Sequence, residues 1–415
     1  MTLIILIILI LMLAAAFFLE KIKLNPPVIL ICIWILPFLL LAAAKPLGLP
    51  VEQVNKYALA IPIGTAIFTA GYFLINRDAR KTDKIVITGP DVRFSVLFKI
   101  IVVLEIIVTL YFLYHLNSFV KDNFRLNYWY TYKVSKDLGT YKEPFFIPYF
   151  RTFARTVLCV LCAYVFSEKL KGRDLIWVAL QVLVTCVMHI LGPGRNEIFA
   201  FLVPIGMAYL IVNSSSLLKL IKNALILAVI LLAVFFFYYY LKYTEASAKI
   251  GDTPLGSFEA YLCGGVVAFS QWAAEGHELA HGAYTFRLIF AVLNRLGFNV
   301  PVAKIVEEFR TLFNAHRCNV YTVYKWYAND FGVIFSVLMQ LPIGMIHGII
   351  TKKFYKRQDV KALTVYCISF FPLIMQFFND EYFSKASTWI QVFLWLFIFL
   401  GTGLMIKQRT DDARV

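Results

Sequence analysis

The stretch LLKLIKNALILAVILLAVFFFYYYL (Leu217 to Leu241) decides the fold of this chain. After Lys222 it carries no charged side chain up to Leu241. About 20 mostly apolar residues in an α-helix are enough to cross the hydrocarbon core of a bilayer. The stretch therefore predicts a membrane-spanning helix.

Similar apolar runs recur along the whole chain, and together they predict its architecture. The eleven candidate spans lie at 2–19, 28–44, 57–75, 94–114, 152–167, 174–191, 198–212, 217–241, 331–350, 363–378 and 388–406. We therefore expect an all-α, polytopic integral membrane protein in which residues 1–415 form a single membrane domain.

The composition supports this expectation and excludes other classes of protein. Of the 415 residues, 60% are hydrophobic and 16% are charged, and the mean hydropathy is +0.73. A soluble domain has about 25% charged residues and 45–50% apolar ones. The chain is therefore not a cytosolic enzyme, a secreted disulfide scaffold or a nucleic-acid-binding domain. Its net charge of +15 is explained by the Lys and Arg residues that mark the cytoplasmic loops of membrane proteins.

The distribution of these cations predicts the orientation. The short loops on one side hold most of them, including the clusters at 77–99 and 352–361, together with the C-terminal tail. The short loops on the other side hold only Lys45, Lys56, Arg195 and Lys385. The basic side is expected to be cytoplasmic. The two long loops, 115–151 and 242–330, are then extracytoplasmic, and we expect the active surface there.

The first long loop combines aromatic rings with two cations. Its rings could stack on sugar faces or form an interfacial aromatic belt, and they are Tyr128, Trp129, Tyr130 and Tyr132. Arg151 and Arg155 lie four residues apart at the start of a span. Paired guanidinium groups there could clamp a phosphate or extend toward lipid head groups.

A short turn on the same side gives a sharper local signal. Residues Gly192 to Glu197 read GPGRNE, so a proline between two glycines is followed by Arg195 at the start of the next span. A helix N-terminus favours an anion. The turn could therefore hold an anionic substrate group, although a plain turn with one Arg is the alternative.

The second long loop has an internal structure of its own. Phe258 to Gly276 is too short and interrupted to span, and is expected to form a re-entrant or interfacial helix. Thr285 to Gly297 is amphipathic, with Arg287 and Arg295 on its polar part. His316 to Gly332 gathers side chains that can bind sugar hydroxyls or phosphate: Arg317, Asn319, Tyr321, Thr322 and Asp330. Cys263 and Cys318 both lie outside, and a disulfide between them is possible.

A five-residue segment of this loop raises a competing hypothesis. His277-Glu278-Leu279-Ala280-His281 matches the H-E-x-x-H pattern, in which two His residues on one helix face bind zinc. Gly276 and Gly282 bracket the segment, which makes the required helix doubtful, and no third ligand follows at the expected spacing. A polar surface turn is the preferred interpretation, with a zinc metalloprotease as a minor alternative.

Two further positions carry carboxylates in or beside predicted spans. Asp380 and Glu381 lie in the last outer loop, Asn379 to Trp389, where one of them could act as a general base toward a sugar hydroxyl; the alternative is a pair of loop acids balanced by Lys385. Glu105 is the one charge deep within a predicted span, and its partner is not apparent from the sequence.

The order of these motifs resembles a known family. Asn319-Val-Tyr-Thr, Asn329-Asp-Phe-Gly and the span ending Gly344-Met-Ile-His-Gly are similar to the late signature of bacterial oligosaccharide repeat-unit polymerases, the O-antigen polymerases. Gly-Pro-Gly-Arg195-Asn-Glu is similar to the short basic turn of that family, and 377–391 is similar to its last outer loop. Each motif alone is weak, but the resemblance covers most of the chain in order.

The resemblance implies a fold and a reaction. The fold would be similar to that of the GT-C membrane glycosyltransferases, embedded in the bacterial inner membrane with the active face in the periplasm. The growing glycan would pass from undecaprenyl pyrophosphate to a sugar hydroxyl of a second lipid-linked repeat unit, with inversion and without a metal or other cofactor. Donor and acceptor would both be undecaprenyl-pyrophosphate-linked oligosaccharides. The pathway also implies a flippase and a chain-length regulator, and no nucleic acid.

The resemblance also assigns roles to residues of this chain. Arg195 would bind the pyrophosphate, with Arg287 and Arg317 as further cations and Arg151 and Arg155 as weaker candidates. Asp380 is the first candidate for the base and Glu381 the second. Asn319 and Tyr321 would position sugar. The H-E-x-x-H segment departs from the family pattern and is interpreted as variable loop.

Two other functions remain open from the sequence. A transporter or flippase of lipid-linked oligosaccharides would also be polytopic, but such proteins often show internal repeats and several buried charges, and neither is evident here. An O-antigen ligase would share the fold type and the pyrophosphate-binding arginines, but would transfer the glycan to a lipid A core.

Overall fold

The chain forms two compact helical units, each assembled from separated stretches. The structure is a computed structural model that describes residues 1–19, 24–50, 52–76, 85–124, 127–192, 196–242, 253–303, 308–313 and 316–408. Unit 1 comprises 1–83, 250–356 and 372–387, and unit 2 comprises 84–249, 357–371 and 388–415. One membrane domain is expected from the sequence. The chain passes between the units at 83/84 and 249/250 and also inside the helices α14, α15 and α16.

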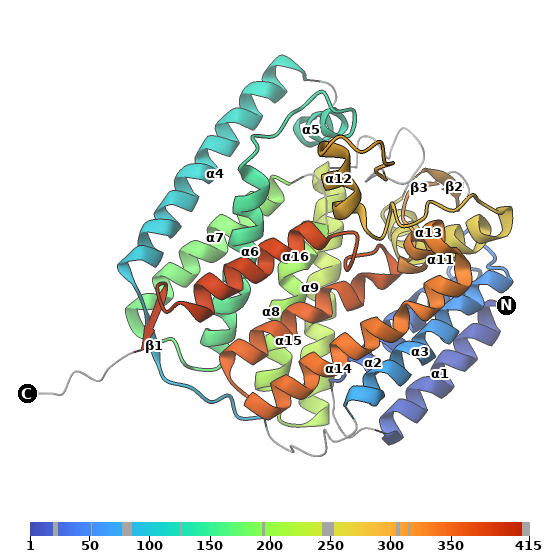
Figure 1. The fold of residues 1–415 in the computed structure, drawn as a ribbon, viewed down its shortest axis with the longest axis horizontal. Coiled ribbons are helices and arrows are strands. Elements are labelled where there is room, and N and C mark those ends of the chain that lie inside the picture. Colours follow the sequence, from blue (N-terminus) through green and yellow to red (C-terminus); the bar gives the residue numbers. More distant parts are fainter. Residues whose placement is uncertain are drawn as a thin grey trace, which may run out of the picture. The chain divides into compact units, whose positions relative to one another are not determined.

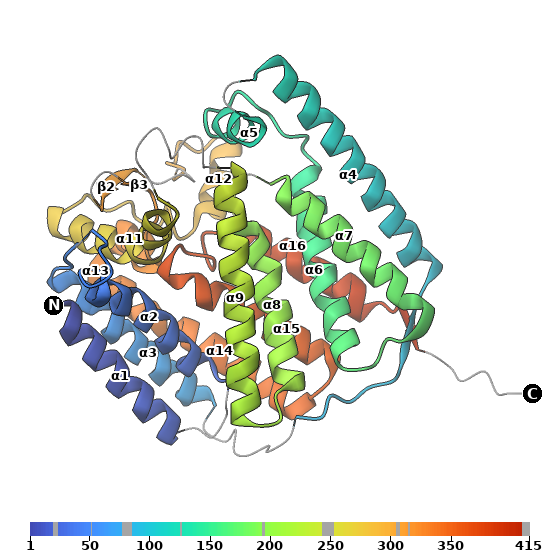
Figure 2. The same cartoon turned by 180° about the vertical axis from the view of Figure 1, so that it is seen from behind.

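Unit 1 contains three N-terminal helices and the elements of the second long loop. Its elements are α1 (Thr2–Leu19), α2 (Pro26–Ala43), η1 (Lys56–Leu59), α3 (Ala60–Ile75), α11 (Pro254–Glu275), α12 (Arg287–Arg295), β2 (Arg310–Leu312), β3 (His316–Cys318), α13 (Val323–Leu338), α14 (Gln340–Arg357), the end of α15 (Val360–Ile374), η3 (Met375–Phe377) and the start of α16 (Ala386–Leu396). Strands β2 and β3 form an antiparallel hairpin. In Figures 1 and 2, α1, α2 and α3 lie side by side.

Unit 2 contains the central helices and the end of the described chain. Its elements are β1 (Val92–Phe94), α4 (Val96–Asp122), α5 (Tyr128–Asp137), α6 (Ile147–Phe166), η2 (Gly172–Asp174), α7 (Leu175–Ile190), α8 (Asn196–Asn213), α9 (Leu217–Lys242), most of α15 and α16, the π-helical turn η4 (Phe397–Gly401) and β4 (Ile406–Gln408). Strands β1 and β4 pair antiparallel. Helix α6 packs against α7 and α8.

The helices confirm an all-α polytopic membrane protein but give a smaller number of clear spans. Within the described ranges, eight helices are long and apolar enough to cross a membrane, at Pro26–Ala43, Lys56–Ile75, Val96–Asp122, Ile147–Phe166, Gly172–Ile190, Asn196–Asn213, Leu217–Leu241 and Val360–Phe377. Three of the eleven expected spans do not correspond to a single helix that is long and apolar enough to cross a membrane. The segments Thr2–Phe18 and Ala386–Gly401 are apolar but shorter, and the expected span 331–350 falls across α13 and α14.

The chain changes direction twice here, at Gly332 inside α13 and at Met339 between α13 and α14. The two helices meet at an angle of 58°. Within α13, Gly332 adopts φ 85° and ψ 167°, a conformation that glycine tolerates because it has no Cβ. The sequence Asn329-Asp-Phe-Gly therefore ends the first half of α13, and the following residues continue in a new direction.

The boundaries of both long loops also differ from the expected ones. The first was placed at 115–151, but α4 continues to Asp122, so the loop starts later and contains α5. The second is expected at 242–330. It contains α11, α12 and the β2–β3 hairpin, and α13 begins at Val323, before the expected end of the loop. Helices are present at both expected places: α11 where a re-entrant or interfacial helix is expected at 258–276, and α12 where an amphipathic helix is expected at 285–297. Hydropathy misplaces these ends because it reports apolar length rather than helix length.

Glycines allow α3 and α14 to pack backbone against backbone in unit 1. A Cβ on Gly344 would lie 2.1 Å from the carbonyl oxygen of Phe68, one on Gly348 would lie 2.8 Å from that of Tyr72, and one on Gly71 would lie 2.4 Å from that of Leu341. Gly344 and Gly348 form a G-x-x-x-G pair of the kind that permits close helix approach in membranes. These two glycines belong to the Gly344-Met-Ile-His-Gly motif, which thus has a packing role.

Gly344→Ala is expected to destabilise the protein by roughly 1–3 kcal/mol, because the added methyl group must separate two backbones in contact. The thermal unfolding temperature of the purified protein in detergent measures this effect. Ile346→Ala is the matched control, since Ile346 lies on the same helix and is 42% exposed. Equal unfolding temperatures for Gly344→Ala and the wild type would contradict the close approach of α3 and α14.

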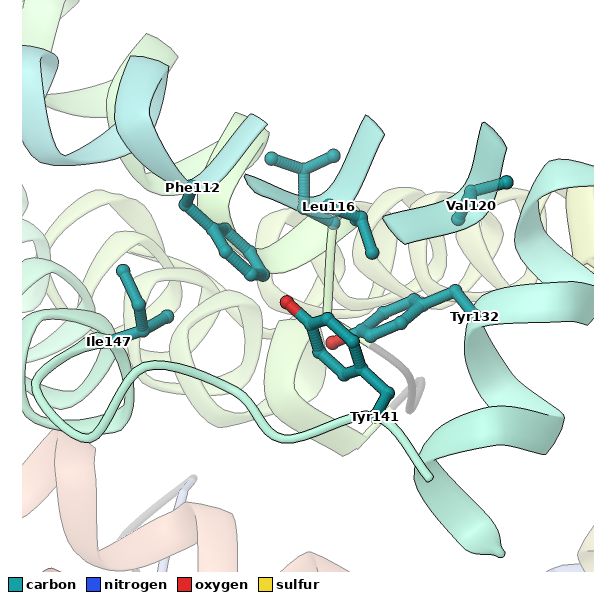
Figure 3. Packing of buried hydrophobic residues seen from close by; sticks show 7 residues of the cluster. Phe112, Leu116, Val120, Tyr132, Tyr141 and Ile147 are labelled. Carbon is teal, nitrogen blue, oxygen red and sulfur yellow. The ribbon is translucent and has the colours of Figure 1, made fainter. Parts of the chain in front are cut away.

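The aromatic residues of the first long loop are used largely for packing within unit 2. Tyr132 and Tyr141 are buried together with Phe112, Leu116 and Val120 of α4 (Figure 3). Tyr128 and Trp129 pack against the same cluster as partly buried side chains. The loop is therefore bound to α4 through its rings, and Tyr132 in particular has no face left for a sugar.

Candidate functional site

The first half of α13 organises the end of unit 1 that the sequence predicts to be extracytoplasmic. Every residue from Val323 to Asp330 is buried, including the polar side chains of Lys325, Tyr327 and Asp330. A buried polar group costs free energy unless it is hydrogen-bonded or paired. Each of these three side chains finds its partners on a different segment, and together they define the site.

Asp330 holds the turn that leads into α12. Its carboxylate accepts hydrogen bonds from the backbone N–H groups of Tyr284 at 3.1 Å and Thr285 at 2.6 Å. The N–H of Ala280 also donates to the carbonyl of Asn329 at 2.8 Å. These three bonds fix the chain just before α12 against α13, so they determine where the arginines of α12 lie.

Tyr327 holds the acidic loop, residues 379–385. Its hydroxyl donates to Oδ1 of Asp380 at 2.9 Å. The carboxylate of Asp380 also accepts from the N–H of Tyr382 at 2.9 Å and from that of Ser384 at 2.8 Å. The Tyr382 hydroxyl lies 3.1 Å from Nε2 of His347 on α14. The acidic loop is thus anchored to both α13 and α14.

A small basic cavity lies where α12 meets the chain just after Asp380 and Glu381. It has a volume of about 230 Å³ and is lined by Arg287, Leu288, Ala291, Val292, Arg295, Ser384 and Ser387. Arg287 and Arg295 are eight residues apart, so both belong to one face of α12. Nε of Arg287 donates to the carbonyl of Ala303 at 3.0 Å, which restrains the guanidinium. Two guanidinium groups and two serines are suited to phosphate oxygens.

Lys325 lies in a separate cluster formed by α11, α13 and the β2–β3 hairpin. Its Nζ is 3.7 Å from the ring centroid of Tyr321, 5.7 Å from that of Trp272 and 3.9 Å from Oε1 of Glu308. Arg310 pairs with Glu275, and its Nε donates to the Tyr321 hydroxyl at 3.1 Å. The hydrogen bonds from Arg310 lower the pKa of the exposed Glu275 carboxyl. This cluster fixes the hairpin to the end of α11.

The structure gives the two candidate bases different environments. Asp380 is fully buried, and burial raises the pKa of its carboxyl while its hydrogen bonds oppose that rise. Glu381 keeps an exposed fraction of 9% and lies 3.4 Å from Nδ2 of Asn379. Asp380 thus shapes the acidic loop, whereas Glu381 retains some access to solvent.

The two expected sugar-binding residues are described, and neither lines the cavity. Tyr321 is buried in the Lys325 cluster, and Asn319 is half-buried after β3. Arg317 is in β3, but its side chain lies outside the described part, and Arg195 lies entirely outside the described residues. Arg287 is the one that lines the cavity among the three expected cations whose side chains the structure describes, Arg151, Arg155 and Arg287.

Arg151 and Arg155 belong to unit 2. Arg151 is 3% exposed and is held between two carboxylates, pairing with Glu143 and with Glu197 at 3.2 Å. Glu143 also pairs with Lys136 at 3.1 Å. Arg155 is half-buried. The charge of Arg151 is therefore already compensated by acids of the protein itself.

The H-E-x-x-H segment does not form the geometry that zinc binding requires. Residues 276–280 are not helical, and His281 has a positive φ of 49°. The His277 ring instead stacks on Trp272 with a centroid distance of 4.4 Å, and its Nε2 lies 2.9 Å from the Trp272 carbonyl oxygen. Within the described ranges, no group of three or more His, Cys, Asp or Glu side chains is arranged to hold a metal ion.

The possible disulfide between Cys263 and Cys318 is not formed. Both thiols are free and buried. The Cys263 thiol donates to the carbonyl of Pro37 at 3.4 Å, and the Cys318 thiol to that of Ala260 at 3.7 Å. Cys318 also packs closely against Gly264: a Cβ on Gly264 would lie 2.6 Å from the Cys318 Sγ. Cys318 therefore has a packing role.

Several residues of the site were not identified as functional from the sequence. Arg295 was recognised only as part of an amphipathic helix, and Ser384 and Ser387 were not considered. Lys325 and Arg310 were also missed. The serines could have been found from their position just after an acidic pair, but the partners of Lys325 depend on long-range contacts that no local pattern reveals.

Glu259 on α11 is a buried carboxyl in an unfavourable setting. It is fully buried, and neither carboxylate oxygen has a hydrogen-bond partner among the described residues. Helix α11 is not among the helices apolar enough to cross a membrane. Burial, and secondarily the charge of Glu52, raise the pKa of Glu259 from its ordinary value near 4.5 to about 7.

This raised pKa predicts a pH-dependent stability. Between about pH 4.5 and 7 the unfolded chain loses the Glu259 proton while the folded chain keeps it, so the free energy of unfolding falls as the pH rises through this interval. Glu259→Gln removes this pH-dependent fall in the free energy of unfolding, because glutamine does not ionise. The variant should unfold at a higher temperature than the wild type at pH 8, and the difference should shrink toward pH 5.

Thermal unfolding of the purified protein at pH 5 and pH 8 measures the effect. Glu278→Gln is the matched control, because Glu278 is an exposed carboxylate in the segment after α11, and its effect should be small at both pH values. If the difference in unfolding temperature between Glu259→Gln and the wild type does not grow from pH 5 to pH 8, Glu259 does not titrate in this range.

Comparison with known proteins does not identify the chain: no family model, no curated protein and no solved structure matches it.

Proposed function

We propose that this chain is an oligosaccharide repeat-unit polymerase, a membrane glycosyltransferase that uses polyprenyl-pyrophosphate-linked substrates. The observation that carries the proposal is the basic cavity between α12 and the acidic loop. It places Arg287 and Arg295 next to the chain segment that bears Asp380 and Glu381. Cations for a leaving pyrophosphate and a carboxylate for the acceptor proton are the two groups that this reaction needs.

The proposed reaction is a single displacement with inversion. The hydroxyl oxygen of the acceptor sugar attacks the anomeric carbon of the donor, and the bond from that carbon to the pyrophosphate oxygen breaks. The pyrophosphate departs on its lipid with the electron pair, stabilised by Arg287 and Arg295. The acceptor proton passes to a carboxylate of the acidic loop.

The structure supports different roles for the two carboxylates in this proposal. Both oxygens of Asp380 accept hydrogen bonds from the protein, so Asp380 is better suited to position the acidic loop. Glu381 is less completely buried, with an exposed fraction of 9% against 0% for Asp380, and we assign the proton transfer to Glu381. Asp380 is the first candidate from sequence and Glu381 the second, so this assignment reverses that order.

The membrane topology belongs to the same proposal. Counting the bent pair α13–α14 as one span and adding α1 and the α16–η4 segment would give eleven crossings, in a fold similar to the GT-C glycosyltransferases. The active face would be periplasmic and the C-terminus cytoplasmic, in a bacterial inner membrane. The pathway would supply a flippase and a chain-length regulator as partners.

The polymer ladder of a deletion strain tests the proposal. Loss of the gene should collapse the lipopolysaccharide or capsule ladder to single repeat units attached to the lipid core. The wild-type chain should restore long polymer. Arg287→Ala/Arg295→Ala should reduce polymer at least about a hundredfold, because two transition-state cations are lost and each such group is worth roughly tenfold or more. The gel profile of extracted glycan is the measurement.

Lys171→Ala/Arg173→Ala is the matched control. Both side chains are exposed and lie outside the cavity, and the variant removes the same charge. This variant should restore the ladder fully. A deletion strain with no repeat unit attached to the core would indicate a ligase instead. Complete loss of surface glycan would indicate a transporter. An unchanged ladder would refute the polymerase.

A further inference from the structure

A second and larger cavity lies in unit 2, near the end of α6 that is remote from Arg151. Its volume is about 640 Å³, within the range of roughly 300–1,000 Å³ typical of small-molecule sites. Tyr164, near the end of α6, lines it, and the rise along the helix places it roughly 20 Å from Arg151. The cavity is therefore separate from the charged network around Arg151.

Hydrogen bonds hold the walls of this cavity in place. The segment from Thr88 to Val92 forms one wall. The N–H of Thr88 donates to the carbonyl of Gln358 at 2.7 Å, and the N–H of Val92 donates to that of Lys169 at 2.8 Å. Strand β1 pairs with β4 on the other side, with Val92 opposite Gln408. The walls of the cavity are thus held by backbone hydrogen bonds and do not depend on surface side chains alone.

The polar part of the lining is predominantly basic. Arg357, Lys361 and Lys407 line the cavity, and Asp359 is the one acid among the described lining residues. Asp359 is already engaged, because Arg357 Nε donates to its Oδ2 at 3.0 Å and the N–H of Ala362 donates to its Oδ1 at 2.7 Å. Lys361 and Lys407 are exposed, so their ammonium groups are available to an anion.

Part of the remaining lining is apolar and lies at or near the ends of apolar helices. Val92, Tyr164, Val360, Phe399 and Ile406 are buried lining residues. Tyr164 is near the last turn of α6, Val360 begins α15, and Phe399 is in η4 directly after α16. A mixed basic and apolar cavity at helix ends is suited to a molecule with an anionic head and an apolar body.

We propose that this cavity binds the phosphate head group of an anionic membrane lipid. The cations Lys361, Lys407 and Arg357 would contact the phosphate oxygens, and the glycerol and upper acyl chains would pack against Phe399 and Leu400. Basic residues at the cytoplasmic boundary of a membrane favour anionic lipids. The site does not depend on the proposed polymerase activity, because it shares no residue with the cavity at α12.

Competitive lipid binding to the purified protein tests the inference. Native mass spectrometry of the full chain in detergent, with equal amounts of phosphatidylglycerol and phosphatidylcholine, would measure relative affinity. Wild type should bind phosphatidylglycerol at least about tenfold more tightly. Lys361→Gln/Lys407→Gln should lose at least about tenfold of that affinity, given the usual combined effect of two basic residues near a charged head group.

Two further variants keep the test decisive. Lys171→Gln/Arg173→Gln removes the same charge from exposed positions of unit 2 outside the cavity and should bind phosphatidylglycerol like the wild type. Lys361→Arg/Lys407→Arg keeps the charge and should retain binding, so a loss in the Gln variant can be separated from misfolding. Equal affinity of wild type for the two lipids, or equal losses in both charge-removing variants, would overturn the proposal.

A separate arm distinguishes a lipid head group from a soluble anion. Inorganic phosphate should leave bound phosphatidylglycerol in place at millimolar concentration, because it lacks the apolar contacts. Thermal stabilisation of the wild type by phosphate, lost in Lys361→Gln/Lys407→Gln and accompanied by no preference between the lipids, would assign the cavity to a soluble phosphate and overturn the lipid proposal.

Discussion

The buried polar side chains of α13 are the constraint on which the end of unit 1 that carries α12 and the acidic loop depends. A helix that buries Lys325, Tyr327 and Asp330 must supply each with a partner, because an unpaired polar group in the interior is costly. Asp330 receives two backbone N–H groups from the turn before α12, and Tyr327 reaches the Asp380 carboxylate. One short helical segment thus positions two surface elements that are distant in the sequence.

The basic cavity follows from this arrangement. Helix α12 contributes the arginines, and the acidic loop and the start of α16 contribute the serines, but neither side makes a cavity alone. The break at Gly332 lets α13 end its buried half there and continue toward α14 in a new direction. After this break, α14 packs on α3 through glycines that bring the two backbones together. The end of unit 1 is therefore built on a closely packed helix pair.

Much of the fold could be predicted from the sequence, because apolar length and amphipathic periodicity are local properties. The spans at 217–241 and 152–167, and the helices at 258–276 and 285–297, appear at nearly the expected places. The number of spans was less predictable, since a bend at a glycine and short end helices do not alter average hydropathy. The extension of α4 to Asp122 was missed for the same reason.

The site was predicted only in part, and the reason is physical. Asp380, Glu381 and Arg287 could be selected because charged residues stand out beside apolar spans. The partners of Asp380 and Asp330 could not be, because a hydrogen bond between positions 327 and 380 leaves no local pattern. Arg151 shows the opposite error: an arginine at the start of a helix suggested an anion site, but Glu143 and Glu197 already compensate its charge.

The affinity of the purified protein for undecaprenyl pyrophosphate tests most directly whether α13 builds the basic cavity. The decisive comparison is Tyr327→Phe against Tyr57→Phe, a half-buried tyrosine of η1 in the same unit. Tyr327 does not line the cavity, but its hydroxyl holds the acidic loop. The account predicts that Tyr327→Phe weakens binding by about tenfold, since a lost hydrogen bond of roughly 1.4 kcal/mol corresponds to that factor, and that Tyr57→Phe binds like the wild type. Equal affinity of Tyr327→Phe and the wild type would contradict it.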